Sequence, residues 1–293
     1  MSRASHTGRS VAHVDGVWFD DARDATIGVL DHGLLYGDGV FEGIRFYGPE
    51  PFALDAHLRR LRASARALVL DVPWSDERLG ALCRETARRT GLQDGYIRLV
   101  VTRGMGALGV SPASCERPSL ILIGAPLALY PAQALEQGVD VVTSSLRRAA
   151  SDALPPQVKS LNYLTNVLAS IEARRQGAHE ALLLDAEGRV AECTADNLFV
   201  VHGGVARTPP ATDGALRGIT RDHVVGLLDA AGVPVIEASL VLADVWTADE
   251  AFMTGTGAEV VAIRSVDGRP FPAAPGPLTR RAQELFAASV RGG

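Results

Sequence analysis

The order of the predicted elements is the feature that most constrains the fold. Apolar residues recur at helical spacing over residues 55–70 and again over 75–91, so two helices are predicted in succession. Strands are predicted on either side of this pair, at 28–47 and at 96–102. Strands and helices grouped in this way are typical of an α+β fold, whereas a regular alternation would predict a parallel α/β sheet.

The chain of 293 residues is long enough for two ordinary domains. Residues 126–136 are predicted to connect a small N-terminal α+β domain, at 1–125, to a larger C-terminal domain, at 137–293. Helices in the larger domain are predicted at 162–175, 218–231 and 278–290, and hairpins at 181–193 and 197–208.

Composition and charge exclude several classes of protein. The chain is 47% hydrophobic and 22% charged, which is typical of a globular protein. Its net charge of −5 argues against nucleic acid as a partner, and arginine pairs such as Arg147-Arg148 are predicted to be solvated. No apolar stretch approaches the roughly 20 residues that span a bilayer, and the N-terminus lacks the apolar run of a secretory signal. Three widely spaced cysteines predict neither a disulfide framework nor a metal site, so a cytoplasmic location is expected.

Lysine is almost absent from this chain. Lysine and arginine together number 29, and 28 of these are arginine, so 29 − 28 leaves one lysine, Lys159. Arginine can replace lysine as a surface charge, but it cannot lose its proton and attack a carbonyl group. The commonest reaction that requires a lysine is Schiff-base formation. The alternative is a surface lysine that remains in an arginine-rich composition.

Two strands of the first domain carry unusual residues. In YGDGVFEGIRFY, at 36–47, glycines alternate with bulky side chains, which indicates a strand close to another backbone or to a ligand, or else a twisted core strand. In YIRLVVT, at 96–102, Arg98 interrupts an apolar run. Burying this arginine requires an anionic partner, which could be a protein carboxylate or a ligand carboxylate.

Features that follow Lys159 extend the Schiff-base hypothesis. Glu192 lies on a predicted strand, where it could face solvent or hold a proton on a cofactor ring nitrogen. The segment 218–220 begins a predicted helix, and 254–257 is a glycine-rich turn. Free backbone N–H groups in such places favour a phosphate, although most glycine-threonine turns bind nothing. Tyr163 could bond a cofactor oxygen or could be an ordinary helix aromatic.

Ten segments together resemble a known family: YGDGVFEGIRFY, HLRRL, YIRLVVTRG, ALGVSP, KSLNYL, EARRQG, ECTADNLF, TPP, LRGITR and TGTGAEV. From about Val11 to Phe286, the chain resembles the fold type IV pyridoxal-phosphate aminotransferases, and most closely the branched-chain amino acid aminotransferases. The resemblance implies a smaller N-terminal α+β domain and a larger C-terminal α/β-barrel-like domain, with pyridoxal 5′-phosphate between them. It also implies a homodimer or a higher homo-oligomer.

The resemblance further implies a role for each matching residue. Lys159 would be the Schiff-base residue and proton carrier, Glu192 would pair with the pyridine nitrogen, and Tyr163 would bond the ring oxygen. The phosphate would be held by Arg60, Gly218, Ile219, Thr220, Gly255 and Thr256. The substrate pocket would be lined by Tyr36, Phe41, Arg45, Tyr96, Arg98, Thr256 and Gly257, and by Val110 from the partner subunit's loop.

The implied activity is the transfer of an amino group from leucine, isoleucine or valine to 2-oxoglutarate by a ping-pong mechanism. The branched-chain enzymes often carry alanine where Gly257 stands. D-amino acid or (R)-amine transaminases of the same fold are an alternative, because the D-amino acid enzymes share the KSLN start. They usually carry an arginine–histidine pair in the strand that reads YIRLVVT, which has no histidine.

Two further alternatives differ in chemistry. Aminodeoxychorismate lyase shares the lysine and the glutamate, releases pyruvate and needs no amino acceptor. A pyridoxal-phosphate-binding module without turnover is the non-enzyme alternative. Lys159 and Glu192 together argue against that module, because binding alone needs neither a proton carrier nor an electron sink.

Overall fold

A computed structural model describes residues 9–149 and 153–291. They form two compact units. The first contains the described residues up to Ala128 together with Val158–Asn162, and the second contains the described residues of 129–157 and those from Tyr163 on. The domain limits at 125 and 137 remain a prediction, and the grouping of Val158–Asn162 with the first unit was not predicted.

The first unit is built on a six-stranded sheet with the strand order β2-β1-β6-β5-β3-β4. Every neighbouring pair in it is antiparallel. The first two strands, β1 and β2, form an antiparallel hairpin near the N-terminus. The strands are β1 (Val11–Val14), β2 (Val17–Phe19), β3 (Gly39–Tyr47), β4 (Glu50–Pro51), β5 (Asp94–Thr102) and β6 (Ser119–Ala125).

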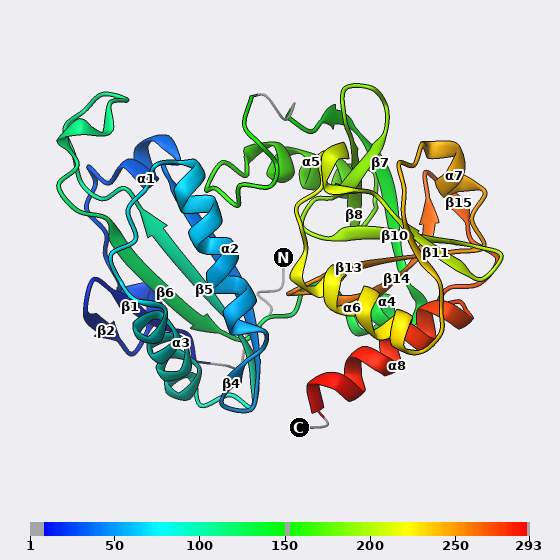
Figure 1. Ribbon diagram of the computed structural model, residues 1–293, viewed down its shortest axis with the longest axis horizontal. Coiled ribbons are helices and arrows are strands. Elements are labelled where there is room, and N and C mark those ends of the chain that lie inside the picture. The colour runs from blue at the N-terminus through cyan, green and yellow to red at the C-terminus, as the bar shows by residue number, and fades with distance from the viewer. Residues whose placement is uncertain (1–8, 150–152, 292–293) are drawn as a thin grey trace. The chain divides into compact units, whose positions relative to one another are not determined.

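Two long helices cover one face of this sheet (Figure 1). They are α2 (Leu54–Ala67) and α3 (Asp76–Thr90), which confirms the predicted pair. The Ser75 hydroxyl accepts a hydrogen bond from the Arg78 N–H (3.2 Å) at the start of α3, and Gly91 ends the helix at φ +68°. Apolar side chains from both helices and from alternate positions of β3, β5 and β6 form the core. Burying each large side chain contributes roughly 1.5–3 kcal/mol.

The strand predicted from residue 28 onward begins later than expected. A five-residue helix, α1 (His32–Tyr36), precedes β3. The Asp31 carboxylate accepts a hydrogen bond from the Gly33 N–H (2.8 Å), and Gly37 ends the helix at φ +68°. These local caps outweigh the alternating pattern, so the strand prediction is wrong for residues 28–38 and correct for β3.

The second unit contains a nine-stranded sheet with the order β12-β11-β10-β13-β14-β7-β8-β9, and β15 pairs with β14. Both predicted hairpins and all three predicted helices are confirmed. The strands are β7 (Val139–Arg147), β8 (Glu180–Leu184), β9 (Val190–Cys193), β10 (Asn197–His202), β11 (Val205–Thr208), β12 (Val235–Glu237), β13 (Glu250–Gly255), β14 (Glu259–Val266) and β15 (Arg269–Pro270). The helices are α4 (Ala132–Gln137), α5 (Leu164–Arg175), α6 (Ile219–Ala230), α7 (Leu242–Trp246) and α8 (Pro277–Arg291).

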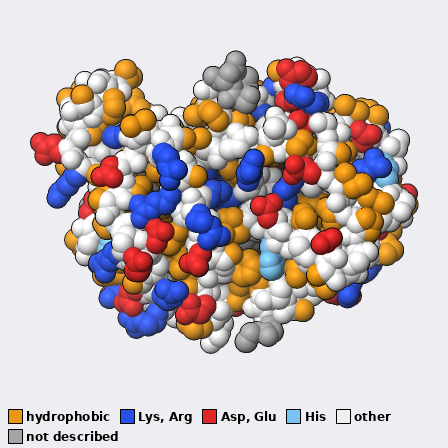
Figure 2. Space-filling model, in the orientation of Figure 1, with side chains coloured by type: hydrophobic (Ala, Val, Ile, Leu, Met, Phe, Trp, Pro, Cys, Tyr) orange, Lys and Arg blue, Asp and Glu red, His pale blue; other side chains and the backbone are white. Residues whose placement is uncertain are grey.

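Charged side chains of both signs are distributed over the surface. Figure 2 shows arginine side chains interspersed with aspartate and glutamate on the face in view, in keeping with the net charge of −5. Within residues 9–149 and 153–291, no helix has the length and apolar character needed to cross a membrane.

Candidate active site

The segment Val158–Asn162 lies along the edge of β3 as a short added strand. The Phe41 N–H donates to the Lys159 carbonyl (3.0 Å), and the Leu161 N–H donates to the Gly39 carbonyl (2.9 Å). A Cβ atom on Gly39 would lie 2.7 Å from the Val101 carbonyl and from the Leu161 side chain. Glycine at this position therefore lets three chain segments pack closely, as the alternating pattern predicted.

The Lys159 side chain lies over an aromatic ring. Its Nζ is 4.4 Å from the centroid of the Phe41 ring, and the Arg98 guanidinium carbon is 4.5 Å from the same centroid. The Lys159 backbone N–H donates to the Ser64 hydroxyl (3.0 Å), so the lysine is held at the backbone by α2. The lysine is half-buried. Two basic side chains, Lys159 and Arg98, therefore lie against one ring.

Four predicted substrate residues share one face of the first sheet. Alternate residues of β3 and β5 pack against α2 and α3, so the residues between them point to the opposite face. Gly43 pairs with Arg98 and Arg45 pairs with Tyr96 across the two strands. A Cβ atom on Gly43 would overlap the Tyr96 hydroxyl. The glycine therefore allows Tyr96 to lie across β3, on the face that also carries Phe41.

Arg98 has an aromatic environment in place of the predicted carboxylate. Its guanidinium carbon lies 4.5 Å from the Phe41 ring centroid and 5.6 Å from that of Tyr96. Among the residues that the structure describes, no carboxylate forms an ion pair with Arg98. Of the two partners predicted for this arginine, a protein carboxylate is therefore not present in the described part of the chain.

The opposite face of β3 carries a buried charged cluster. The Glu42 carboxylate accepts hydrogen bonds from Arg60 at Nε (2.8 Å) and Nη2 (2.7 Å), and its Oε2 lies 2.8 Å from Nδ1 of His57. Burial alone would raise the pKa of Glu42, but the charge and hydrogen bonds of Arg60, together with the hydrogen bond from His57, outweigh it and lower that pKa to about 2. Burial also lowers the pKa of His57, which is therefore neutral at pH 7. The predicted phosphate residue Arg60 thus lies on α2, not on the face that carries Arg98.

Tyr36 and Val110 lie together near a loop of the first unit. The Tyr36 hydroxyl accepts a hydrogen bond from the Gly109 N–H (2.8 Å), and Nε2 of His32 lies 3.0 Å from the Ala107 carbonyl. Val110, next in the loop, is 84% exposed. Its predicted role in a partner subunit's pocket requires such exposure and remains a prediction.

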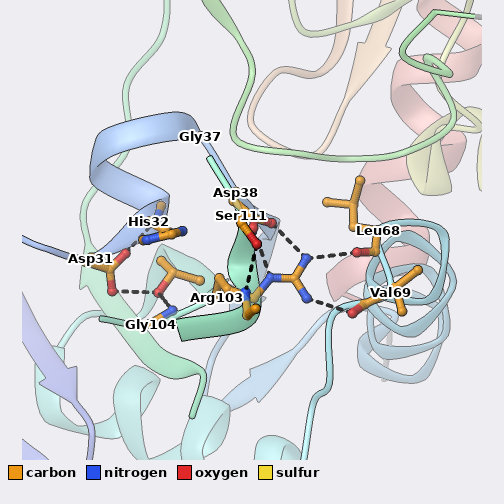
Figure 3. Close-up of polar contacts among 12 residues, drawn as sticks. Asp31, His32, Gly37, Asp38, Leu68, Val69, Arg103, Gly104 and Ser111 are labelled. Carbon is orange, nitrogen blue, oxygen red and sulfur yellow. Dashed lines mark hydrogen bonds and ion pairs between the residues drawn. The ribbon is translucent and has the colours of Figure 1, made fainter. Parts of the chain in front are cut away.

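Arg103 fixes the base of this loop (Figure 3). Its guanidinium donates two hydrogen bonds to the Asp38 carboxylate, at 2.9 and 3.0 Å. It also donates to the carbonyls of Leu68 (2.8 Å) and Val69 (2.6 Å) at the end of α2. The loop therefore starts from a point that is tied to both α2 and β3.

In the second unit, Glu192 is buried and hydrogen-bonded on both oxygens. It lies on β9 and is 5% exposed, so the solvent-facing alternative is wrong. Its Oε1 accepts from Nη2 of Arg148 (2.7 Å), and its Oε2 accepts from Nδ2 of Asn197 (3.2 Å) and the Leu216 N–H (3.0 Å). A buried carboxylate with this set of donors has a fixed orientation.

Arg148 was not predicted as a site residue, and the expectation that its side chain is solvated is wrong. Only 12% of the side chain is exposed, and it also donates to the Gly214 carbonyl (3.1 Å). An arginine doublet gives no local signal that distinguishes a buried member from a solvated one. Asn197, Glu42, His57 and Ser64 were also missed as contacts, because the sequence around each of them does not show which polar group it meets in the fold.

The segment 218–220 begins α6 as predicted. Gly218 is the N-cap residue, and no side chain caps the helix there. A Cβ atom on Gly218 would overlap Oδ1 of Asn197, so the glycine lets the Asn197 side chain lie against the start of the helix. Ile219 and Thr220 form the first turn, where N–H groups and the helix dipole favour an anion.

The remaining predicted residues lie at two other places in the second unit. Gly255 ends β13, and a Cβ atom there would overlap Oδ1 of Asp196. Thr256 and Gly257 follow in the turn and are partly exposed. Tyr163 is the half-buried residue that immediately precedes α5.

Comparison with known proteins assigns the family. Residues 39–266 match the family described as amino-transferase class IV. The chain belongs to this family. Its fold is the class IV aminotransferase fold with mixed helices and strands, as the resemblance implied, and the enzymes of this class use pyridoxal 5′-phosphate.

Similar proteins cover nearly the whole chain. A putative branched-chain-amino-acid aminotransferase of Methanocaldococcus jannaschii is 47% identical over 269 residues, which are 92% of each chain. The crystal structure of the Escherichia coli branched-chain amino acid aminotransferase matches with a TM-score of 0.92 at 38% identity, over 97% of this chain and 95% of that one. The branched-chain amino acid aminotransferase of Thermobaculum terrenum, solved in its PLP form, matches with a TM-score of 0.85 at 29% identity, over 97% of this chain and 95% of that one.

Proposed function

We propose that this aminotransferase moves the amino group of leucine, isoleucine or valine to 2-oxoglutarate with pyridoxal 5′-phosphate as its cofactor. The names of the similar proteins support the branched-chain substrate. The single observation that carries the proposal is Arg98, which lies against the rings of Phe41 and Tyr96, beside Lys159. An arginine in that environment suits the carboxylate of an amino acid or a 2-oxo acid.

The residues present fit the cofactor by their chemistry. Lys159 is the only lysine in the chain and supplies a primary amine, and Glu192 supplies a buried carboxylate. The start of α6, which no side chain caps, supplies N–H donors for a phosphate. Arg60, Gly218, Ile219, Thr220, Gly255 and Thr256 would hold that phosphate.

Pyridoxal phosphate, when bound, supplies a carbonyl group for amines and an electron-withdrawing ring. Lys159 would move a proton at its Nζ, taking it from the α-carbon of the substrate and delivering it to the C4′ carbon of the cofactor. Glu192 would hold a proton on the ring nitrogen through a carboxylate that three donors orient, and Tyr163 would donate to a ring oxygen.

The substrate side chain would contact mainly apolar surface. Phe41 presents its ring beside Lys159, and Tyr96 lies across Gly43. Arg45, Thr256, Gly257 and Tyr36 would complete the pocket, with Val110 from the partner subunit. An apolar pocket of this kind favours a branched aliphatic side chain over a charged one.

We also propose a homodimer. Two neighbouring segments of the first unit, 27–35 and 105–110, expose eight apolar side chains, more than scattered single residues would give. They are Ile27, Val29, Leu30, Leu34, Leu35, Met105, Leu108 and Val110. In the second unit α5 exposes Leu164, Val167, Leu168 and Ile171 at helical spacing along one face.

We place the enzyme in the cytoplasm, which suits the free thiols of Cys83, Cys115 and Cys193.

A steady-state panel of L- and D-amino acids and chiral amines, each with 2-oxoglutarate, tests the activity. The proposal expects turnover of L-leucine, L-isoleucine and L-valine. Turnover confined to D-amino acids or (R)-amines would contradict it. In a separate assay without an amino acceptor, pyruvate release from aminodeoxychorismate would indicate a lyase.

Analytical ultracentrifugation tests the dimer. Leu34→Asp places a charge within the apolar surface of the first unit and should shift the protein toward the monomer. Val69→Asp is the matched control, because Val69 is 86% exposed and lies outside that surface. If the wild type and both variants all sediment as monomers, the proposed dimer is refuted.

A further inference from the structure

Glu42, on β3, is the more completely enclosed member of the ion pair that it forms with Arg60 of α2. It is 0% exposed, and each of its oxygens accepts a hydrogen bond from Arg60, at 2.8 and 2.7 Å. A carboxylate that accepts hydrogen bonds from both Nε and Nη2 binds one edge of the guanidinium, and this fixes the plane of the guanidinium group. The side chain of Arg60 then loses the rotational freedom that an arginine normally keeps.

His57 also forms a hydrogen bond with Glu42. Its Nδ1 lies 2.8 Å from Oε2 of Glu42, and because the ring is neutral this contact is an Nδ1–H group that donates to the carboxylate. A neutral donor stabilises the carboxylate without adding a second positive charge beside it. Arg60 therefore remains the only cation that pairs with Glu42 among the described residues.

The cluster continues along α2 to the lysine segment. His57, Arg60 and Ser64 are spaced three and four residues apart, so they lie along one face of the helix. The Ser64 hydroxyl accepts from the Lys159 backbone N–H at 3.0 Å. One helix face thus carries the predicted phosphate arginine and holds the backbone of the lysine.

We propose that Glu42, supported by His57, is a positioning residue that holds the Arg60 guanidinium in the orientation in which it binds the cofactor phosphate. This inference rests on the proposed function, in which Arg60 is a phosphate residue. Glu42 touches neither the cofactor nor the substrate in this proposal and acts only through Arg60. A buried ion pair that served stability alone would show no preference for ligands that carry a phosphate.

Ligand affinity distinguishes the two roles. The cofactor-free protein is titrated with pyridoxal phosphate and, separately, with pyridoxal, which has the same ring and aldehyde but no phosphate. Glu42→Gln should weaken pyridoxal phosphate binding about tenfold or more and leave the Kd for pyridoxal within about twofold. Arg60→Ala should give the same pattern, and the double variant should bind no more weakly than Arg60→Ala alone.

Matched variants control for folding and for charge. Arg59→Ala removes the exposed neighbouring arginine of α2 and should change neither Kd. His57→Leu should weaken pyridoxal phosphate selectively, and His57→Gln, which keeps an N–H donor, should restore much of that loss. Circular dichroism at the titration temperature confirms that each variant is folded.

Two results would overturn the inference. If Arg60→Ala is selective for pyridoxal phosphate but Glu42→Gln and His57→Leu are not, the positioning role is wrong while the proposed function stands. If Arg60→Ala weakens both ligands equally, Arg60 is not a phosphate residue, and both the inference and that part of the proposed site fail. A wild-type protein that binds neither ligand would refute the cofactor assignment itself.

Discussion

Nζ of Lys159 lies 4.4 Å from the centroid of the Phe41 ring, so the face of this ring orients the only lysine in the chain. The ring also receives the Arg98 guanidinium at 4.5 Å. Phe41→Leu removes the ring but keeps an apolar side chain. Cation–π contacts of this kind are worth about 0.5–2 kcal/mol each, so we expect kcat/KM to fall about 3- to 30-fold with little loss of stability.

Phe46→Leu is the matched control for this change. Phe46 lies on the same strand but is fully buried against α2 and α3. We expect this variant to lower the melting temperature while it leaves kcat/KM nearly unchanged. The reverse pattern would show that the Phe41 ring has no part in orienting the lysine.

Lys159→Arg keeps a positive charge but cannot form a Schiff base, because a guanidinium does not lose its proton in proteins. We expect transaminase activity to vanish and the visible absorption band of the bound cofactor to be lost. Borohydride reduction of the wild-type protein with pyridoxal phosphate should label one lysine peptide, since the chain has a single lysine. A label on the N-terminal amine alone, or activity in Lys159→Arg, would refute the assignment.

His57 predicts a change of stability with pH. Burial, with smaller contributions from Arg60 and Lys159, lowers the pKa of His57 in spite of its hydrogen bond to Glu42. The unfolded chain therefore binds a proton near pH 6.5 that the folded protein does not bind, and the free energy of unfolding falls as the pH drops below about 6.5. The limit for one histidine is about 1.4 kcal/mol per pH unit.

His57→Gln should remove this part of the slope in urea unfolding between about pH 5 and 7, because glutamine does not titrate. Burial also lowers the pKa of His13 and of His223, so these residues contribute to the slope in both proteins. The difference in slope between the two proteins therefore reports His57 alone. Parallel curves for the wild type and His57→Gln would contradict the buried, neutral imidazole. Below about pH 4.5, the lowered pKa of Glu42, at about 2, should add a second loss of stability.

Gly43→Ala tests the space that β3 leaves for Tyr96. The added methyl group would overlap the tyrosine hydroxyl, so the ring must move. We expect a lower melting temperature and a raised KM for the amino acid, and Tyr96→Phe in the same chain should relieve part of the strain. Gly226→Ala, where no atom lies within 4 Å of the new methyl group, should be neutral or slightly stabilising. A KM that Gly43→Ala does not change would exclude Tyr96 from the substrate pocket.

Glu250 caps α8 from the adjacent strand β13. Its carboxylate accepts from the N–H groups of Leu278 (3.0 Å) and Thr279 (2.9 Å) and from the Thr279 hydroxyl (2.8 Å). Glu250→Gln weakens these bonds in a buried site, and we expect a loss of about 1–3 kcal/mol in the free energy of unfolding. Glu284→Gln, at an exposed position of α8, should change it by less than about 0.5 kcal/mol. Equal effects of the two changes would show that the cap contributes nothing.

Features that depend on nearby residues were predictable from the sequence. The helix α3 begins after Ser75 and ends at Gly91 because both caps are local. Lys159 was proposed from its chemistry, since a single amine among many guanidinium groups indicates a task that arginine cannot perform, and its catalytic role stays a prediction. The family followed from ten segments that each occupy a short stretch of sequence.

Features that depend on distant partners were not predictable in this way. Local periodicity does not reveal that Val158–Asn162 pairs with β3, or that Arg148 binds Glu192. The helix α1 was missed because its Asp31 and Gly37 caps lie within a glycine-rich pattern that also suits a strand. The separation of Arg60 from Arg98, on opposite faces of one sheet, required the register of β3.

The added strand that carries Lys159 has a consequence for dissecting the protein. A fragment that stops at residue 128 would leave the Phe41 N–H and the Gly39 carbonyl unpaired along the edge of β3. Such an open edge invites pairing with other chains, so the fragment should self-associate. A synthetic peptide spanning 157–163 should pair with that edge and suppress this edge-to-edge association, and it would bring the lysine amine back to the Phe41 ring from a separate chain.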